Sequence, residues 1–477
     1  MGELTINGLE LVDKFHPNQI DDDTIKKKFF SGKQFIKFYG NQIELPLIPP
    51  ALSQNILFTG GIGSGKTNAI CELLDQLLDK MGKNDVMIIF DSKGDFAERF
   101  PAKLYPKLNM KFLSNDRISN VFWNVFKEAV IDLSPSATRQ EINDALLEVS
   151  SILFQPMIDK DKNNPFFTLA AKNIFYGISK VLCEKYYIQT RNPNAVTNRM
   201  IFEYSQKPVK EIVKDFTSPA CYSELNQLVD YLGRLDSNLG FKFNDQGASV
   251  LATLRNTLLE IFKGNFVKDG SFSVREFISS PGSKVLFVEY DIRQGQVLAP
   301  IYKAILDFAI KEALSRHRVK RNVFFVIDEF RLLPKLDYMD AGVNFGRALG
   351  AKFIIGIQNI LQIDDVYGKP MARSILSGFL TIVNFRTVDS ETREYIKSLF
   401  GKRIYVYDNL NITGGQTRER DDVVTDNDIL KLKTGQAIIG IPVLTKNPIL
   451  FQFLKYDDYL KQKKKENEAI RWGCGML

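Results

Sequence analysis

The chain has 477 residues, 44% of them hydrophobic, which is enough for two or three domains around a sizeable core. Its 63 basic and 56 acidic residues give a net charge of +7, which permits an anionic partner without requiring one. Four widely spaced cysteines and two histidines argue against a disulfide framework or a zinc site. The sequence has neither a signal-peptide pattern nor an apolar run that could span a membrane, so we expect a cytoplasmic protein.

Residues 1–50 form a lead-in segment in which short apolar runs alternate with charged patches, among them Lys26–Lys28. The segment ends at Pro49 and Pro50, directly before an apolar run of strand length. This pattern predicts a strand or a hairpin ahead of the first domain.

The stretch Asn55–Ile70, NILFTGGIGSGKTNAI, predicts a strand, a phosphate loop and a helix. Gly60, Gly65, Lys66 and Thr67 occupy the fixed positions of the G-x-x-x-x-G-K-[ST] motif, or Walker A. Its glycines let backbone N–H groups surround a phosphate at the positive end of a helix. We expect Lys66 to neutralise the phosphate oxygens of ATP and Thr67 to bind Mg²⁺. The predicted nucleotide contacts are Gly60, Gly61, Ile62, Gly63, Ser64, Gly65, Lys66, Thr67 and Asn68.

A second apolar run, Val86–Phe90, ends in the polar turn Asp91–Asp95. Such a turn at the carboxyl end of a strand lies where open α/β sheets bind ligands. Trp123 and Asn124, in the aromatic run VFWNVF, are more typical of a core than of a site.

From about Ser136 the hydrophobic spacing changes to three and four residues, as at Ile142, Leu146 and Val149. This helical periodicity continues to Phe262, with Gly264 in the position of a helix cap. We therefore predict an all-α domain over residues 136–263, inserted into an α/β domain formed by residues 51–135 and 264–455.

The strand pattern resumes after the insertion, with helical patterns between the strands. The predicted strands are Val285–Tyr290, Val323–Ile327, Lys352–Ile357 and Leu380–Phe385, followed by closing strands at Gln436–Pro442 and Pro448–Phe453. Runs that are apolar on both faces and alternate with helices indicate a mostly parallel sheet covered on both sides. The fold class is therefore α/β, and residues 456–477 are left as a basic tail.

Asp328 and Glu329 follow the buried strand Val323–Ile327, which is the Walker B arrangement. In that arrangement the first carboxylate holds Mg²⁺ through water and the second polarises the attacking water. An apolar run ending in Asp-Glu is a weak signal alone, but a Walker A motif in the same chain makes the interpretation strong.

Three further polar residues are candidates for catalysis. Gln358 ends the next strand, where an amide could contact the γ-phosphate or orient the water, as in RecA-like ATPases; the alternative is a solvent-facing side chain. Arg347 lies on a short helix at the expected domain edge, so a catalytic Arg347 would act across a subunit interface as an arginine finger. The alternatives are a surface role for Arg347, or Arg386 in either position.

The stretch Asp328–Gly368, together with GGIGSGKT, FDSKGDF and WNVF, resembles the type IV coupling proteins of bacterial conjugation, the TraD and TrwB group of the HerA/FtsK superfamily. The resemblance covers roughly residues 35–455. It implies a RecA-like motor domain with an all-α domain facing the cytosol, assembled as a hexameric ring on DNA. Matching positions imply nucleotide-site roles for Lys66, Thr67, Asp328, Glu329, Arg347 and Gln358, with Arg347 as the finger.

The resemblance also implies partners: DNA, a relaxase or relaxosome, and secretion-channel proteins. The transmembrane anchor with which members usually begin has no counterpart here, so we expect either its loss or peripheral recruitment to the inner membrane through partners. Candidate DNA contacts are Lys26–Lys28, Arg316–Arg321 and Lys461–Lys465, although charge runs are usually solvated faces.

The favoured function is an ATP-driven DNA translocase that couples the relaxosome to a type IV secretion channel. One alternative is an adaptor ATPase that recruits protein substrates for export. Another is a HerA/FtsK-like DNA motor in repair or phage defence. An ATPase response to DNA separates the first from the second, and neighbouring genes for a relaxase and a channel separate it from the third.

Overall fold

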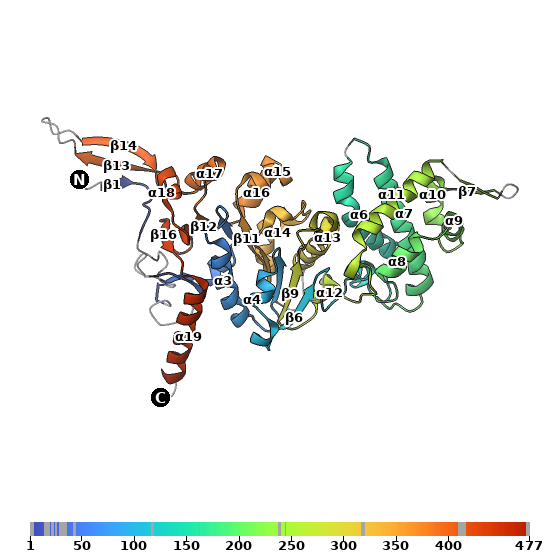
Figure 1. Ribbon diagram of the computed structural model, residues 1–477, viewed down its shortest axis with the longest axis horizontal. Helices are drawn as coiled ribbons and strands as arrows, with labels where there is room; N and C mark the ends of the chain where they lie inside the picture. Colours follow the sequence, from blue (N-terminus) through green and yellow to red (C-terminus); the bar gives the residue numbers. More distant parts are fainter. Residues whose placement is uncertain are drawn as a thin grey trace.

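The computed structural model describes residues 4–13, 20, 23, 26–27, 36–41, 44–115, 119–161, 163–236, 240–243, 245–315, 320–408 and 416–473. The molecule is elongated, with a sheet in the middle, a helical segment at one end and a projecting β-hairpin at the other (Figure 1). Both chain termini lie at the hairpin end.

The central sheet has nine strands in the order β16-β15-β12-β4-β11-β10-β5-β9-β6. All neighbours from β12 to β6 are parallel, whereas β15 and β16 are antiparallel additions at one edge. The strands are β4 (Ile56–Thr59), β5 (Val86–Asp91), β6 (Asn109–Leu113), β9 (Lys284–Glu289), β10 (Val323–Ile327), β11 (Ala351–Ile357), β12 (Thr381–Phe385), β15 (Gln436–Gly440) and β16 (Ile449–Gln452). The predicted α/β fold with a mostly parallel sheet is confirmed; the edge strand β6 is the one that the sequence pattern does not predict.

Alternate residues of each central strand face two separate cores. Phe325 of β10 packs against the side of α13 (Gly295–Ala313), α14 (Met339–Phe345) and α16 (Lys369–Ser377). Phe324 packs on the other face with α3 (Lys66–Lys80), α4 (Asp95–Arg99) and the β2–β3 hairpin. Burial on both faces explains why these strands read as continuous apolar runs.

The helical segment shares the first of these cores with the sheet, because buried side chains run without a break from β10 into α6 and α7. Its elements are α5 (Val125–Val130), α6 (Arg139–Lys160), α7 (Phe166–Leu182), a π-helical turn (Cys183–Tyr187), α8 (Asn198–Ser205), α9 (Val209–Phe216), α10 (Tyr222–Leu232) and α11 (Asp245–Ile261). The next helix, α12 (Val274–Ser279), packs against α13 and belongs to the sheet domain.

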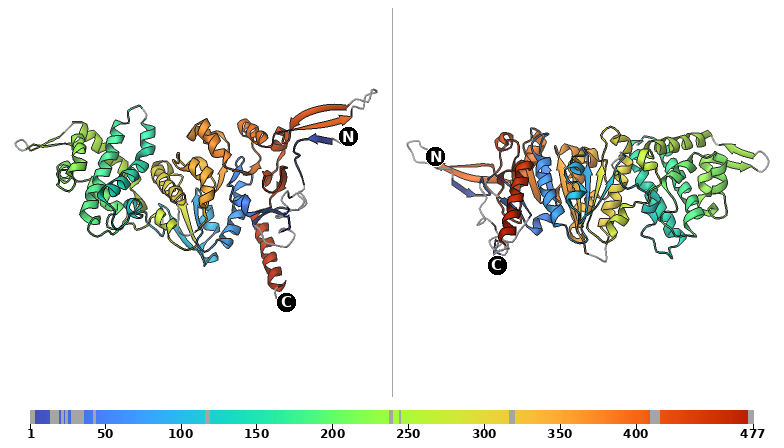
Figure 2. Two further views of the ribbon diagram at one scale, coloured as in Figure 1. Left: turned by 180° about the vertical axis from the view of Figure 1, so that it is seen from behind. Right: turned by 60° about the horizontal axis from the view of Figure 1, so that its bottom comes forward.

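The prediction that residues 136–263 are wholly helical is wrong at one place. The short antiparallel strands β7 (Gly233–Asp236) and β8 (Gly240–Phe243) form a hairpin between α10 and α11. The hairpin projects from the far end of the segment (Figure 2). Two strands of only four residues each leave little hydrophobic periodicity for a sequence pattern to reveal.

The lead-in segment contributes to two places in the fold. β2 (Ile36–Tyr39) and β3 (Glu44–Leu47) form a hairpin as predicted, followed by the single-turn helix α2 (Pro49–Leu52). β1 (Leu4–Asn7) instead pairs with β13 (Lys402–Asp408), which pairs with β14 (Gln416–Asp422) in the projecting sheet.

The remaining helices belong to the sheet domain. They are α15 (Leu361–Tyr367), α17 (Ser390–Phe400), α18 (Asp426–Lys431) and α19 (Tyr456–Gly473), with short 3₁₀ turns at Ala102–Leu104, Gly264–Val267, Phe330–Leu332 and Gly346–Leu349. Among the described residues, none of the helices combines the length and the apolar character that crossing a membrane requires.

A buried carboxylate joins the helical segment to the sheet domain. Glu128 of α5 is fully buried and accepts hydrogen bonds from the Trp123 indole (2.8 Å), the Ser273 hydroxyl (2.8 Å) and the Val274 amide (2.7 Å). It thereby caps α12, whose first turn offers free N–H groups. Trp123 is buried, so the prediction that the WNVF run belongs to the core is confirmed.

We expect Glu128→Gln to lower the free energy of unfolding by about 2–3 kcal/mol, because an amide cannot accept all of these bonds. Glu203→Gln, at an exposed position of α8, should change it by less than about 0.5 kcal/mol. Urea unfolding of both variants, followed by tryptophan fluorescence, measures the difference. Equal stability of the two variants would contradict the capping role of Glu128.

Candidate functional site

The phosphate loop connects β4 to α3 at the carboxyl edge of the sheet. Gly60, Gly63 and Gly65 have positive φ angles of 145°, 72° and 116°, a region that favours glycine. A Cβ atom at Gly60 would also lie only 2.6 Å from the Cβ of Phe385 on β12. The glycines are therefore required by backbone conformation and by close packing against the neighbouring strand.

Lys66 is the first residue of α3 and its ammonium group turns back into the loop. Nζ donates to the carbonyl oxygens of Gly60 (2.5 Å) and Gly61 (3.1 Å). Burial lowers the pKa of Lys66, and the nearby carboxylates of Asp328 and Glu329 oppose that shift. A phosphate in the loop would offer this buried charge a stronger acceptor than two carbonyls.

Thr67 and Asp328 meet although 261 positions separate them in the chain. The Thr67 hydroxyl donates to Oδ2 of Asp328 at 2.7 Å. Asp328 is buried, which raises the pKa of its carboxyl, and its Oδ1 has no hydrogen-bond partner among the described residues. A hydroxyl and a free carboxylate oxygen are hard ligands, so this pair fits Mg²⁺.

Glu329 lies beside this pair and is held by an amide. Nε2 of Gln358 donates to Oε2 of Glu329 at 2.8 Å, while Oε1 of Glu329 has no hydrogen-bond partner among the described residues. One oxygen is thus oriented and the other can accept a proton or position a water molecule. The structure brings Lys66, Thr67, Asp328, Glu329 and Gln358 together at one edge of the sheet.

Gly356 of β11 is a site residue that sequence reasoning missed. A Cβ atom there would lie 2.3 Å from the backbone oxygen of Asp328 and 3.2 Å from its Oδ1. β11 lies between β4 and β10, so its glycine lets Asp328 approach the loop. The signal in the sequence is a glycine inside the apolar run KFIIGI, which often marks a close approach.

The two candidate arginines lie at opposite ends of the parallel strands, one at their amino ends and the other at their carboxyl ends. Arg347 precedes β11 and is exposed at the amino edge, so the length of β11, roughly 20 Å, separates it from the phosphate loop. Arg386 follows β12 at the carboxyl edge, where its backbone oxygen accepts from the Gly61 amide at 2.8 Å and its side chain is exposed. Within one chain only Arg386 is beside the loop.

The polar turn after β5 is mainly structural. The Asp91 carboxylate accepts from the amides of Phe96 (3.0 Å) and Ala97 (2.9 Å) and so caps α4. Lys93 in the same turn is exposed, and its charge acts on both Lys66 and Asp328. Sequence reasoning marked this turn as a ligand-binding position but did not single out Lys93.

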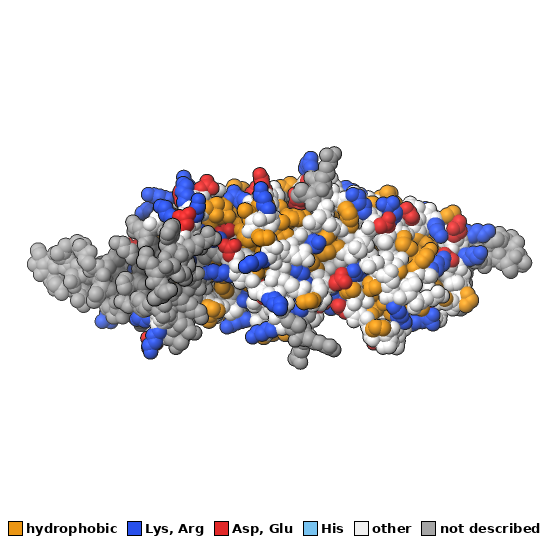
Figure 3. Space-filling model, turned by 90° about the horizontal axis from the view of Figure 1, so that it is seen from below, with side chains coloured by type: hydrophobic (Ala, Val, Ile, Leu, Met, Phe, Trp, Pro, Cys, Tyr) orange, Lys and Arg blue, Asp and Glu red, His pale blue; other side chains and the backbone are white. Residues whose placement is uncertain are grey.

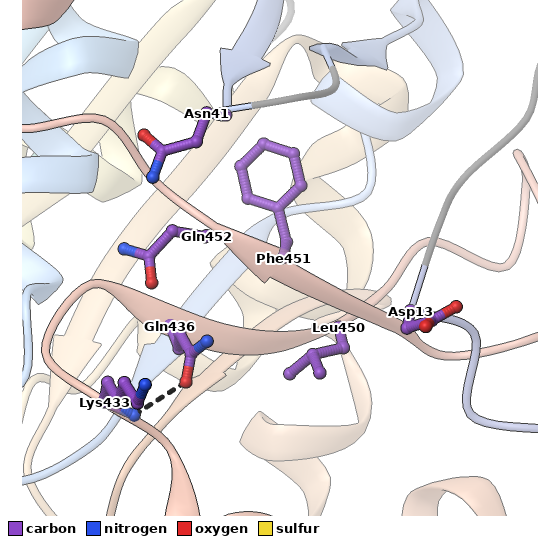
Figure 4. Close-up of a pocket in the computed structure, with 8 residues that line it drawn as sticks. Asp13, Asn41, Lys433, Gln436, Leu450, Phe451 and Gln452 are labelled. Atoms are coloured by element: carbon purple, nitrogen blue, oxygen red, sulfur yellow. Dashed lines mark hydrogen bonds between the residues drawn. The ribbon is translucent and has the colours of Figure 1, made fainter.

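One further loop residue, Ser64, contacts the turn that leads into β15. The carbonyl of Ser64 accepts from the Gly435 amide at 2.8 Å, and Ile62 at the tip is 88% exposed. Beyond Gly435 lies a hollow of about 350 Å³ at the same edge of the sheet (Figure 4). Its polar lining includes Asn41, Lys433, Gln436 and Gln452.

Asn68 is a predicted nucleotide contact whose side chain faces away from the phosphate loop. Its amide bonds to the backbone at Leu454 and Tyr456, where the C-terminal helix begins. Any contact of Asn68 with a nucleotide would therefore have to involve its backbone.

A parallel sheet that carries a phosphate loop on one strand and Asp-Glu two strands away, with a polar strand end between them, defines a P-loop NTPase fold of the RecA-like class. The sequence also matches a protein-family model over most of its length. The chain belongs to the family described as the type IV secretion-system coupling protein DNA-binding domain, whose model matches residues 41–441.

The chain is similar to the coupling protein TraD of Escherichia coli (strain K12), with 22% identity over 412 residues. The match covers 84% of this chain and 52% of TraD, so the chain spans about half the length of this curated relative.

Solved structures support the fold. The conjugative coupling protein TrwBdeltaN70 in its unbound monoclinic form has a TM-score of 0.68 at 18% identity, covering 95% of this chain and 94% of that chain. TrwB in complex with a non-hydrolysable ATP analogue has a TM-score of 0.66 at 18% identity, with 95% and 94% covered. VirB4 of Thermoanaerobacter pseudethanolicus has a TM-score of 0.50 at 15% identity, with 89% and 96% covered.

Thr67→Val keeps the shape of the side chain but removes the hydroxyl that bonds to Asp328. We expect it to weaken binding of a fluorescent ADP analogue at least about tenfold in the presence of Mg²⁺, with little change in EDTA. Thr67→Ser keeps the hydroxyl and should stay within about threefold of wild type. Equal loss of affinity with and without Mg²⁺ would contradict a metal role for Thr67.

Proposed function

We propose that this chain is an ATP-driven DNA translocase that couples a DNA substrate and its relaxase to a type IV secretion channel. The observation that carries the proposal is the contact of Thr67 with Asp328, with Glu329 oriented beside it by Gln358. Membership of the coupling-protein family supports the DNA substrate and the secretion partner.

The loop would hold ATP by its backbone N–H groups and Lys66, whose ammonium would leave the Gly60 carbonyl for the β- and γ-phosphate oxygens. Thr67, and Asp328 through water, would hold Mg²⁺, which supplies positive charge against the phosphates. The free oxygen of Glu329 would take a proton from the attacking water, and Gln358 would keep that carboxylate in place.

Arg347 would complete the site of a neighbouring subunit. Since it is exposed at the edge opposite its own phosphate loop, only a head-to-tail arrangement of copies brings it to a nucleotide. A closed ring of this kind, a homo-hexamer in our proposal, would place a finger at each interface. Arg386, beside the loop of its own chain, is the candidate for a contact made in cis.

DNA would pass through the ring on basic side chains that contact phosphates without reading sequence. Lys and Arg side chains are scattered among acidic, hydrophobic and other side chains on the face drawn in Figure 3. In the predicted basic run Arg316–Arg321, Arg321 is buried and donates to the carbonyls of Ile278, Ser279 and Ser280. It is therefore not a candidate DNA contact.

The other lysines and arginines of the predicted basic runs differ in exposure, and some lie outside the described residues. Lys26 and Lys27 are described and Lys27 is exposed, whereas Lys28 and residues 316–319 lie outside the described residues. In the C-terminal run Lys464 and Lys465 are exposed, while Lys463 pairs with Asp75 and Asp79. Lys27, Lys320, Lys464 and Lys465, which are exposed, are therefore the better candidates. We place the protein at the cytoplasmic side of the inner membrane, recruited by its channel partners.

ATPase assays of wild type, Lys66→Ala and Arg347→Ala, each with and without single- and double-stranded DNA, test the proposal. We expect DNA to stimulate the wild type and both variants to lose at least about 100-fold in kcat, because each removes charge from the transition state. Arg199→Ala, an exposed arginine of the helical segment, is the matched control and should remain within twofold. Hydrolysis that ignores DNA would favour the adaptor function instead.

Mixing the two inactive variants tests whether the finger acts between subunits. A Lys66→Ala subunit still offers its Arg347 to a neighbour with an intact loop, so mixed assemblies should recover part of the activity. No recovery at any mixing ratio would rule out Arg347 as a finger supplied in trans.

A further inference from the structure

The Walker A helix α3 carries a stripe of polar side chains along one side. Asn68, Glu72, Asp75, Gln76 and Asp79 follow a helical spacing of three and four residues. Glu72, Asp75 and Gln76 are buried, which is unfavourable for polar groups unless each finds a partner. The stripe therefore specifies which elements lie against α3.

The stripe begins next to the catalytic residues, at Asn68. Its side-chain Nδ2 donates to the carbonyl of Leu454 at 2.8 Å, and its Oδ1 accepts from the amide of Tyr456 at 2.8 Å. Two opposed hydrogen bonds fix both the position and the orientation of an amide. The residue after Thr67 is thus joined to the first turn of α19.

Two turns further along, Asp75 holds the same helix. Its carboxylate accepts from the Tyr459 hydroxyl (2.5 Å) and from Lys463 Nζ (2.5 Å), and also from the Tyr105 hydroxyl (2.7 Å). Lys463 forms a second ion pair with Asp79. Tyr459 is completely buried, so α19 is packed against α3 as well as hydrogen-bonded to it.

The β2–β3 hairpin closes the arrangement. Glu72 accepts from the Tyr39 amide (2.5 Å), and Gln76 both accepts from the Lys37 amide (3.0 Å) and donates to its carbonyl (2.8 Å). From α19, Glu466 returns to the Tyr39 hydroxyl (2.9 Å) and to the Lys37 ammonium group (3.2 Å). The β2–β3 hairpin and α19, which come from opposite ends of the chain, thus hold one helix.

The same C-terminal segment is also linked to the phosphate loop through Gly435. The Phe453 amide donates to the Gly435 carbonyl at 2.9 Å, and the Gly435 amide donates to Ser64 at 2.8 Å. The backbone at Leu454 and Tyr456 is therefore hydrogen-bonded to Asn68, just after the loop, and Phe453 is linked to Ser64 within the loop through Gly435. A shift of α19 would therefore change the positions of Lys66 and Thr67.

We propose that Asn68 is a positioning residue and that α19 acts through it as a clamp, holding the first turn of the Walker A helix where Lys66 and Thr67 bind the nucleotide. This inference rests on the nucleotide site of the proposed function. The clamp does not touch the reacting atoms, and it acts by reducing the freedom of the groups that do.

The test compares three variants with wild type in binding of a fluorescent ADP analogue with Mg²⁺ and in steady-state ATP hydrolysis. Asn68→Ala removes the amide, and the double variant Tyr459→Phe with Lys463→Met releases α19 from Asp75 while keeping the buried ring. We expect each to raise the Kd and the KM about five- to tenfold, with kcat within twofold. Asp457→Asn, at an exposed position of α19 outside the basic run, should match wild type.

Hydrogen exchange supplies the readout that a purely structural role would not change. By linkage, nucleotide binding should slow exchange of α19 amides in wild type, and this protection should disappear in Asn68→Ala. If Asn68→Ala weakens binding but the Tyr459/Lys463 double variant does not, α19 does not act on the site and the clamp is wrong. Absence of nucleotide-dependent protection in wild type would overturn it too.

Different results would refute the proposed function and the clamp. A wild type that binds the analogue but hydrolyses no ATP would refute the motor, and the clamp would then be judged on Kd and exchange alone. A wild type that binds no nucleotide would refute both.

Discussion

The site depends on one constraint: β4, β11 and β10 must end at the same edge of the sheet in a fixed register. Ile357 of β11 pairs with Thr59, and Ile327 of β10 pairs with Ile355, so the residues that follow each strand emerge side by side. This register brings Thr67 within hydrogen-bonding distance of Asp328. A slip of one residue would turn the polar strand ends into the core.

The parts of this arrangement that local chemistry determines could be predicted from the sequence. The phosphate loop and the buried strands follow from glycine spacing and apolar runs, and Asp328 and Glu329 follow from the end of such a run. Gly356 and Lys93 were missed because their role comes from neighbours far away in the chain. The β7–β8 hairpin and the docking of α19 against Asp75 likewise depend on tertiary contacts that no local pattern encodes.

Buried polar groups connect the parts of the molecule. Glu128 caps α12 at the boundary of the helical segment, and Asp75 gathers Tyr105, Tyr459 and Lys463 around the Walker A helix. Apolar packing alone would allow neighbouring elements to slide past one another. A buried carboxylate is stable only when its hydrogen-bond donors are in place, so it fixes the positions of the elements that carry them. These contacts therefore fix how the helical segment and the C-terminal helix are placed, while the shared cores supply most of the stability.

The pairing of β1 with β13 and the packing of α19 along α3 leave both termini at one pole of an elongated molecule, with the helical segment at the opposite pole (Figure 1). A label or an affinity handle at either terminus would therefore lie near the β13–β14 hairpin and far from the helical segment. The molecule could be anchored to a support by its end and still present the helical pole to a binding partner, in a single known orientation.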